Sequence, residues 1–320
     1  MAKARPRKGR PINGVVLLNK PEGMSSNHAL QRVKRLYNAQ KAGHTGALDP
    51  LATGLLPICL GEATKFSQYL LDADKAYRVH ALLGVRTSTS DSEGEVVATA
   101  EVGVNEMQVR SEVQRFIGTQ QQSPSIYSAL KHEGRPLYYY ARKGIEVPRK
   151  TRTITFYEIE FISLQNNVLE LQVSCSKGTY IRTLIDDLGQ ALGCGAHVIR
   201  LHRNSVAGLD SRQMLNLEQL EALQQENALD DVLQSVDCLL QALPVQQISA
   251  AEARDMLHGQ AITNRCDSVF EVGQQCRMEC LRQDGQQQFI GIGILKDDGL
   301  FWPKRVVALQ YAGFTLAELI

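Results

Sequence analysis

The sequence predicts a protein of mixed helices and strands that ends in a small β-rich domain. Short apolar or alternating segments, such as residues 14–18 and 76–84, are typical of strands. The residues after Ser26 and residues 179–188 carry apolar side chains at the spacing of amphipathic helices. After the helical stretch at 213–240, the sequence changes to short segments typical of strands and turns. This change places a domain boundary near residues 243–250.

The elements can be assigned in chain order from periodicity and from the residues that flank each segment. The first strand leads into a turn at residues 20–23 and a helix capped by Ser25 or Ser26, and Thr179 is expected to cap the helix at 179–188. The remaining expected elements are helices at 62–74, 105–117 and 213–240, strands at 153–163 and 168–175 around Gln165-Asn-Asn167, and tail strands at 276–281, 289–295 and 300–309 with turns at Asp284-Gly285 and 297–299.

Length and composition restrict the class of protein. A chain of 320 residues suggests two domains, or one large domain with an appendage, and an apolar fraction of 43% suffices for a real core. No apolar run is long enough to span a bilayer. Residues 1–10 are basic without an apolar signal core, so we expect a cytoplasmic protein with a disordered N-terminal tail. The formal charge of +1 means that local patches must carry any affinity for nucleic acid.

The cysteines do not indicate a disulfide framework or a metal site. Seven are scattered along the chain, and an odd, irregular set fits a reducing compartment. Cys266, Cys276 and Cys280 alone approach a metal pattern, but no Cys-x-x-Cys pair or paired histidine accompanies them. We therefore expect no zinc.

Residues 41–58 form the segment around which the chain is organised. The segment holds three glycines, two prolines, one histidine and a single acid, Asp49. Gly43 and Gly46 permit unusual backbone angles, and Pro50 biases Asp49 towards an extended conformation. A rigid, apolar-backed loop with one carboxylate suits a nucleophile or a general base. The alternative is a buried turn whose aspartate caps a following helix.

Residues 119–152 differ from their neighbours in combining aromatic side chains with cations. The tyrosines are Tyr127 and Tyr138 to Tyr140, and the cations are Lys131, Arg135, Arg142, Lys143, Arg149, Lys150 and Arg152, against the acids Glu133 and Glu146. Such a mixture suits a flexible loop that clasps looped or single-stranded nucleic acid by stacking and phosphate contact. An ordinary surface loop with some tyrosines folded onto the core is the alternative.

Arg182 falls in the first turn of the helix at 179–188, where helix polarity disfavours a cation. Its position suggests a specific anionic partner, although a routine exposed arginine is also consistent with the sequence.

Residues 43–54 resemble the signature loop of the TruB family of bacterial tRNA pseudouridine synthases. The resemblance covers nearly the whole chain, specifically in the first part and loosely in the C-terminal domain, which resembles a PUA domain. The further matching segments, all in the family's order, are Lys65-Phe66, Lys75-Ala-Tyr77, Ser128-Ala-Leu-Lys131, Gly134-Arg-Pro-Leu-Tyr138, Ala141-Arg-Lys-Gly144, Lys177-Gly-Thr-Tyr-Ile-Arg182 and Gly195-Ala-His197.

Small departures from the family's pattern remove no catalytic group. Ala47 stands where the family often has Thr or Ser, and Ser125 follows Pro124 where some members have a second proline. Residues 201–209 are looser than the usual Leu-Arg-Arg run, which affects only the expected RNA contacts near His202.

The resemblance implies an organisation and an activity. It implies an α+β pseudouridine synthase fold on a largely antiparallel central sheet at residues 11–245, with a thumb-like insert at about 123–152, and a PUA-like RNA-binding domain at 246–320. The implied reaction converts the T-loop uridine at tRNA position 55 to pseudouridine by base flipping. Neither a cofactor nor a metal is expected, and the tRNA T arm is the expected partner of a monomer that needs no other protein.

The resemblance also implies the site residues. Asp49 is the catalytic aspartate, Arg182 its ion-pair partner, and Tyr77 the aromatic ring on which the flipped base stacks. His44 fills the space that nucleotides leave in the T loop. The remaining residues with an implied place in the substrate or RNA site are Lys65, Tyr180, Leu201, Lys131 and Arg142.

The chemistry gives these residue types a physical purpose. Breaking the N1–C1′ bond builds positive character at C1′, which an ionised carboxylate can stabilise or attack. Apolar surroundings would raise the pKa of Asp49, and a paired guanidinium at Arg182 would oppose that shift. A stacked base cannot reach the carboxylate, so it must be flipped out and held against an aromatic face such as Tyr77.

Three other functions remain open at this level. The chain could bind or fold RNA without catalysis, although phosphate binding needs no carboxylate. A nucleoside or glycoside hydrolase would ordinarily need a second carboxylate and access to water, and no equally persuasive partner acid stands out. A pseudouridine synthase with another RNA target is the third alternative.

Overall fold

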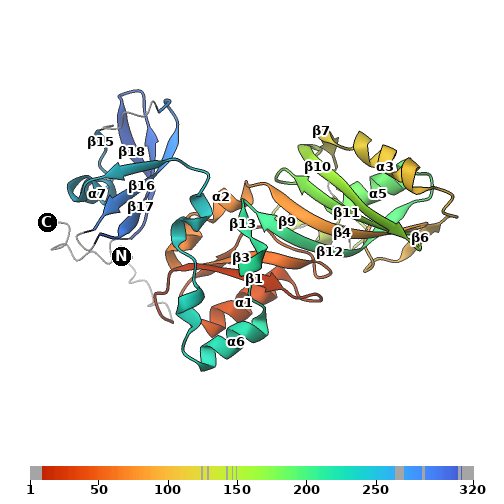
Figure 1. Cartoon of the computed structure of the whole chain (residues 1–320), viewed down its shortest axis with the longest axis horizontal. Coiled ribbons are helices and arrows are strands. Elements are labelled where there is room, and N and C mark those ends of the chain that lie inside the picture. Colours follow the sequence, from red (N-terminus) through yellow and green to blue (C-terminus); the bar gives the residue numbers. More distant parts are fainter. Residues whose placement is uncertain are drawn as a thin grey trace.

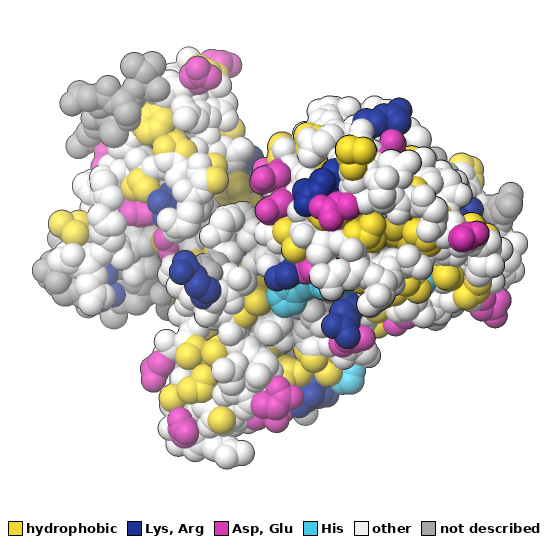
Figure 2. Space-filling model, turned by 45° about the vertical axis from the view of Figure 1, so that its right-hand side comes forward, with side chains coloured by type: hydrophobic (Ala, Val, Ile, Leu, Met, Phe, Trp, Pro, Cys, Tyr) yellow, Lys and Arg dark blue, Asp and Glu magenta, His cyan; other side chains and the backbone are white. Residues whose placement is uncertain are grey.

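Two β-sheets of nine and five strands organise the chain in the computed structural model (Figure 1). The structure describes residues 9–123, 125–127, 130–141, 143–145, 147–148, 150–263, 270–282, 285–308 and 311. Across these ranges, no helix is both long and apolar enough to cross a membrane. Basic and acidic side chains are interspersed on the face that Figure 2 shows, in line with the net charge of +1.

The nine-stranded sheet is largely antiparallel, as predicted. Its strand order is β1-β3-β12-β4-β11-β10-β7, with β2 on β3 and β13 on β12. Among its named strands only the β3–β12 pair is parallel. The strands are β1 (Gly14–Lys20), β2 (Ala42–His44), β3 (Thr53–Leu60), β4 (Lys75–Leu83), β7 (Gly118–Gln122), β10 (Arg152–Gln165), β11 (Val168–Cys175), β12 (Ala196–Val206) and β13 (Leu209–Asp210).

Helices and short hairpins surround this sheet. Figure 1 shows α1 and α6 beside β1 and β3, and α3 and α5 beside the β4–β11–β10 part. The α-helices are α1 (Ser26–Leu36), α2 (Ser67–Leu71), α3 (Glu106–Arg115), α4 (Leu137–Ala141), α5 (Ile181–Ala191) and α6 (Leu217–Gln225). The 3₁₀ helices are η1 (Gly61–Lys65), η2 (Ser211–Gln213), η3 (Leu229–Val232) and η4 (Val236–Leu240), and the hairpins pair β5 (Val85–Thr87) with β6 (Val96–Thr99) and β8 (Lys131–His132) with β9 (Arg135–Pro136).

The predicted periodicities position the core. Alternate residues of β4, from Tyr77 to Leu83, are buried, and the apolar face of α5 packs against them. Strands β10 and β11 join through Asn166 and Asn167, both with positive φ, which is the two-residue hairpin geometry that the right-handed twist of strands favours. Both the alternating strand and the hairpin were predicted correctly.

Three helix predictions differ from the structure. The helix expected at 62–74 is divided into η1 and α2, because Phe66 departs from helical angles between them. In the range 213–240 only α6 is α-helical, since Asn216 caps its start and Asn227 has a positive φ beyond its end. The expected Thr179 cap is wrong. Tyr180 is the N-cap of α5, and its backbone N–H and C=O bond to the side-chain amide of Gln122.

The C-terminal sheet packs against η1 and α2 of the first domain. Its strand order is β14-β16-β17-β18-β15. Phe66 meets Phe289 edge to face with ring centroids 5.2 Å apart, and the Tyr69 hydroxyl lies 2.6 Å from Gln275 Oε1. The elements are β14 (Val245–Ile248), α7 (Ala250–Leu257), β15 (Ile262–Thr263), β16 (Gln275–Leu281), β17 (Gln287–Leu295) and β18 (Leu300–Val306), whereas Cys266, Asp284 and Leu309 lie outside the described residues.

Gly54 allows β12 to run beside β3. Gly54 has a φ of +96°, and a Cβ atom there would lie 2.4 Å from the carbonyl oxygen of Arg203 and 2.8 Å from its nitrogen. No real side chain tolerates such backbone contacts, so this close approach of the two strands requires glycine.

We predict that Gly54→Ala lowers the free energy of unfolding more than the same change at a glycine that has a positive φ but open space around its Cβ position. Gly23 has a φ of +75° with nothing within 4 Å of its Cβ position, so it is the matched control. Denaturant unfolding should show a loss of about 1 kcal/mol for Gly23→Ala from backbone strain alone. For Gly54→Ala the strain and the clash together should cost at least about 3 kcal/mol. Equal losses would mean that β12 moves aside at little cost.

Candidate active site

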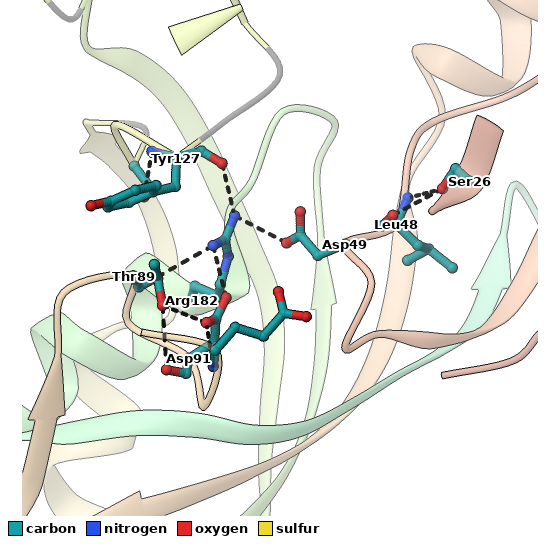
Figure 3. Close-up of polar contacts among 9 residues, drawn as sticks. Ser26, Leu48, Asp49, Thr89, Asp91, Tyr127 and Arg182 are labelled. Atoms are coloured by element: carbon teal, nitrogen blue, oxygen red, sulfur yellow. Dashed lines mark hydrogen bonds and ion pairs between the residues drawn. The ribbon is translucent and has the colours of Figure 1, made fainter. Parts of the chain in front are cut away.

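The loop that carries Asp49 is fixed on both sides of the carboxylate. Ser26 Oγ donates to the Leu48 carbonyl (2.9 Å) and accepts from the Leu48 N–H (2.7 Å), as Figure 3 shows. On the other side the carbonyl of Pro50 accepts from the Gly23 N–H (2.8 Å) and from the Lys20 ammonium (3.3 Å). These bonds leave the Asp49 side chain little freedom of direction.

Arg182 joins Asp49 to a second carboxylate, Asp91. Its Nη2 lies 3.0 Å from Asp49 Oδ2, and its Nη1 lies 2.8 Å from Asp91 Oδ2. The guanidinium stands between the two acids in Figure 3 and also donates to the carbonyls of Thr89 (3.3 Å) and Tyr127 (3.5 Å). The side chains of Arg182 and Asp91 are 6% and 1% exposed, against 42% for Asp49. Asp91 is therefore the buried anchor, and Asp49 is the carboxylate available to a ligand.

Burial raises the pKa of Asp49. The Arg182 guanidinium opposes this shift, whereas the negative charge of Asp91 adds to it. The pKa remains above the ordinary value, because burial outweighs the attraction of the nearby cations.

Two cavities meet at Asp49 and Arg182. The smaller, of about 350 Å³, is walled by Tyr77 of β4, Leu201 of β12 and Tyr180 at the start of α5. The larger, of about 840 Å³, lies beside the loop of residues 88–95 and the start of α1. A carboxylate at their junction can reach a group bound in either cavity.

Tyr77 forms part of a buried wall of the smaller cavity. Its side chain hydrogen-bonds to that of Arg203, its cross-strand neighbour on β12. Burial raises the pKa of the Tyr77 phenol, and the Arg203 charge partly opposes this effect. The ring is thus a neutral, fixed aromatic surface.

His44 lines the larger cavity rather than the smaller one. Burial, assisted by the charge of Arg203, lowers the pKa of His44, so its imidazole is neutral at neutral pH. Its Nδ1 is buried without a hydrogen-bond partner among the residues that the structure describes.

Two further predicted contact residues, Lys65 and Lys131, do not line this site. Lys65 lines neither cavity. Its ammonium lies 2.7 Å from Glu62 Oε2 and donates to the Val306 carbonyl of β18 at 3.1 Å, so it joins the two sheets. Lys131 is exposed on the short hairpin β8–β9. Arg142 lies outside the described residues.

The tyrosine-rich segment does reach the site. The Tyr127 carbonyl accepts from Arg182, Leu130 lines the smaller cavity, and Ala141 lines the larger one. Within its described part, the Arg135 guanidinium stacks on the ring of Tyr139 at 4.5 Å.

Sequence reasoning missed three charged residues of the site. Asp91 lies in a polar stretch between β5 and β6, where its carboxylate resembles an ordinary turn acid. Lys20 and Arg203 are fully buried cations on strands, at 0% and 1% exposure. Neither cation had a local signal, because Lys20 was expected in a turn and no strand was expected around Arg203.

The described residues show no arrangement suited to a metal. They contain no group of three or more His, Cys, Asp or Glu side chains that could hold an ion. The cysteines among them are free thiols.

Three family models together match almost the whole chain. The TruB family pseudouridylate synthase N-terminal domain matches residues 34–181, and the tRNA pseudouridylate synthase B C-terminal domain matches residues 182–241. The C-terminal model of pseudouridine synthase II TruB matches residues 244–307.

Full-length relatives and solved structures agree with these models. The chain is 62% identical to tRNA pseudouridine synthase B of Idiomarina loihiensis over 97% of this chain and 99% of the relative. It is 52% identical to the protein of the same name from Aliivibrio salmonicida over 96% and 98%. The archaeal box H/ACA Nop10–Cbf5 complex contains a chain of similar fold, with a TM-score of 0.69, 22% identity and coverage of 96% and 92%. The likeness confirms the predicted α+β fold with a β-rich C-terminal domain.

We predict that Asp91→Asn lowers the pKa of Asp49. Removing the Asp91 charge removes a repulsion and leaves Arg182 with one anionic partner, and both effects favour the ionised form of Asp49. An NMR titration of the Asp49 side-chain carboxyl measures the change. Arg182→Gln is the opposing control and should raise the same pKa. An unchanged Asp49 pKa in both variants would contradict electrostatic coupling through Arg182.

Proposed function

Because the chain belongs to the TruB family and is a tRNA pseudouridine synthase, we propose that it isomerises the T-loop uridine at tRNA position 55, with Asp49 as the catalytic carboxylate. The observation that carries the proposal is the ion pair between Asp49 and Arg182 at the mouth of an aromatic-walled cavity. The pair supplies an ionised carboxylate and a surface for a flat base in one place.

The ion pair meets the first requirement of the reaction. The isomerisation breaks the N1–C1′ bond, turns the uracil, joins C5 to C1′ and releases the C5 proton. Positive character at C1′ needs a negative group nearby. Arg182 favours the ionised form of Asp49 despite burial.

The smaller cavity meets the second requirement. A uridine in a folded T loop is stacked, so it must leave the stack before Asp49 can reach it. A cavity of about 350 Å³ with Tyr77, Tyr180 and Leu201 in its walls suits one extruded nucleotide. We place the flipped uracil against Tyr77, and we assign to His44 the space that the displaced nucleotides leave.

The other parts of the chain complete the proposal. We propose residues 11–245 as the catalytic domain, with residues 123–152 closing on the T arm, and residues 246–320 as a PUA-like domain that adds RNA contacts. Asp49, Arg182 and the cavity walls come from one chain, which supports action as a monomer without an obligatory protein partner. A cytoplasmic location, with access to tRNA, belongs to the same proposal.

A label at uracil C5 tests the reaction. An unmodified tRNA transcript with tritium at C5 should release its label with one pseudouridine formed per tRNA, at position 55. A T-arm minihelix should react as well if the T arm suffices. Free uracil would indicate a hydrolase, and neither product would leave only an RNA-binding protein.

We predict that Asp49→Asn abolishes turnover while tRNA binding stays nearly intact, because the amide keeps the shape of the side chain but not its charge. A filter-binding assay and the tritium assay measure the two effects separately. Asp231→Asn, at an exposed acid in η3, is the matched control and should retain full activity. Substantial activity of Asp49→Asn would remove Asp49 from the centre of the proposal.

We predict that Tyr77→Phe retains tRNA affinity, since the aromatic face survives, but slows turnover because the hydrogen bond to Arg203 is lost. Single-turnover rates and dissociation constants distinguish the two effects. A collapse of binding would show that the hydroxyl contributes mainly to affinity.

A further inference from the structure

We propose that Lys75 and Arg203 form the anion-binding end of the smaller cavity and stabilise the negative charge that uracil acquires when its bond to C1′ breaks. The inference rests on the proposed function and extends it to two charged residues in the wall of the cavity.

The two cations lie together in the wall of the cavity that Asp49 also lines. A Cβ atom at Gly46 would lie 3.5 Å from Arg203 Nη1 and 3.8 Å from Lys75 Cε, so the two side chains approach the same point. Arg203 is 1% exposed and donates from Nε to the Leu55 carbonyl (2.7 Å) and from Nη2 to the Gly46 carbonyl (3.2 Å). These bonds fix its guanidinium in place.

Neither cation is neutralised by an acid within the described part of the chain. The Lys75 ammonium donates to the carbonyls of Leu70, Leu71 and Ala73, at and just beyond the end of α2. Of the acids near it, Asp72 pairs with Lys177 at 3.0 Å, and Asp74 accepts from the Tyr157 hydroxyl at 3.0 Å. Two neighbouring cations without a paired carboxylate cost free energy, which a bound anion offsets.

The reaction supplies such an anion. When the N1–C1′ bond breaks, its electron pair stays on N1, and the negative charge spreads over N1, O2 and O4 of the uracil. The turned uracil then gives an electron pair from C5 to C1′, the C5 proton leaves to a base, and N1 gains a proton. Charge therefore develops with opposite sign at the two ends of the bond: positive at the sugar, beside Asp49, and negative at the base, beside Lys75 and Arg203.

The walls of the cavity favour a base over a backbone phosphate as the anion. Tyr77, Leu201 and Leu71 surround the position of the two cations with aromatic and aliphatic surface. A hydrated phosphate would lose solvent there without enough hydrogen-bond donors, whereas a flat anion with delocalised charge can stack. The hydrogen bond from Arg203 to Tyr77 fixes the cation beside the ring.

The pH dependence of the rate gives a second test of the role of Lys75. Burial and the charge of Arg203 lower the pKa of Lys75 to about 8, against smaller opposing effects of Cys175, Asp74 and Asp72. The ammonium is therefore charged at neutral pH and loses its charge as the pH rises through that value. An arginine at position 75 would stay charged throughout this pH range.

The test compares Lys75→Gln with Lys75→Arg in the full-length protein under single-turnover conditions. Loss of one preorganised donor to a developing anion predicts a rate lower by about 100-fold for Lys75→Gln, with the dissociation constant for tRNA unchanged. Lys75→Arg should retain most of the rate, and its rate should stay level at the alkaline pH where that of the wild type falls. Arg115→Gln removes an exposed charge on α3 and should change neither quantity.

A substrate with 5-fluorouridine at the target position separates charge stabilisation from a structural role. It has no C5 proton to lose, so its rearrangement is followed by nucleoside analysis of the digested RNA instead of tritium release. Fluorine stabilises the uracil anion by itself, so the deficit of Lys75→Gln should shrink with this substrate. We expect Arg203→Lys to retain a higher single-turnover rate than Arg203→Gln, as for the Lys75 variants. Thermal unfolding shows whether the Arg203 variants are folded, and the Lys75 variants alone are used if they are not.

Three results would overturn the inference. A deficit in affinity that disappears at high salt would assign the two cations to a phosphate. A loss of single-turnover rate that is equally large with uridine and 5-fluorouridine, or equally large in Lys75→Arg and Lys75→Gln, would mean that Lys75 acts only by packing against α2. An unchanged rate would exclude any part in the reaction, and wild-type protein that forms no pseudouridine would instead contradict the proposed function.

Discussion

The active site depends on one buried guanidinium that serves two carboxylates. Arg182 is fixed by Asp91, which is itself almost inaccessible, and presents its other nitrogen to Asp49. Removing both acids would leave a buried charge without a partner, which is among the costlier changes a folded protein can undergo. The same constraint explains why the half-buried Asp49 is fixed in direction yet accessible to a ligand: its loop is fixed by Ser26 and Lys20, and its charge is held by Arg182.

The central sheet determines what lies opposite this ion pair. Strands β3, β4 and β12 are neighbours, so the Asp49 loop, Tyr77 and Arg203 meet at one cavity although they come from distant parts of the sequence. The close approach of β3 and β12 at Gly54 places the Arg203 side chain next to Gly46. The cavity thus has an acid, two cations and an aromatic ring in its walls, which suits the charges that develop along a breaking glycosidic bond.

The sequence predicted the residues whose signals are local. Tyr77 lies on the inward side of an alternating strand, Arg182 stands in an unfavourable first turn, and Asp49 follows two glycines and precedes a proline. Asp91 and Arg203 have no such signal, because their partners are separated from them by 91 and 157 residues and are brought close only by tertiary structure. The position of Lys65 has no local signal either: a cation after a buried strand does not reveal that it binds the backbone of a second sheet.

A double-mutant cycle between Asp91 and Arg182 tests the central claim most directly. If Asp91 acts on the reaction only through Arg182, then Asp91→Asn should change the single-turnover rate of the wild type but not that of Arg182→Gln. The double variant would then be no slower than Arg182→Gln alone. Losses that multiply would contradict the account, because they would show that Asp91 and Arg182 contribute to the reaction independently.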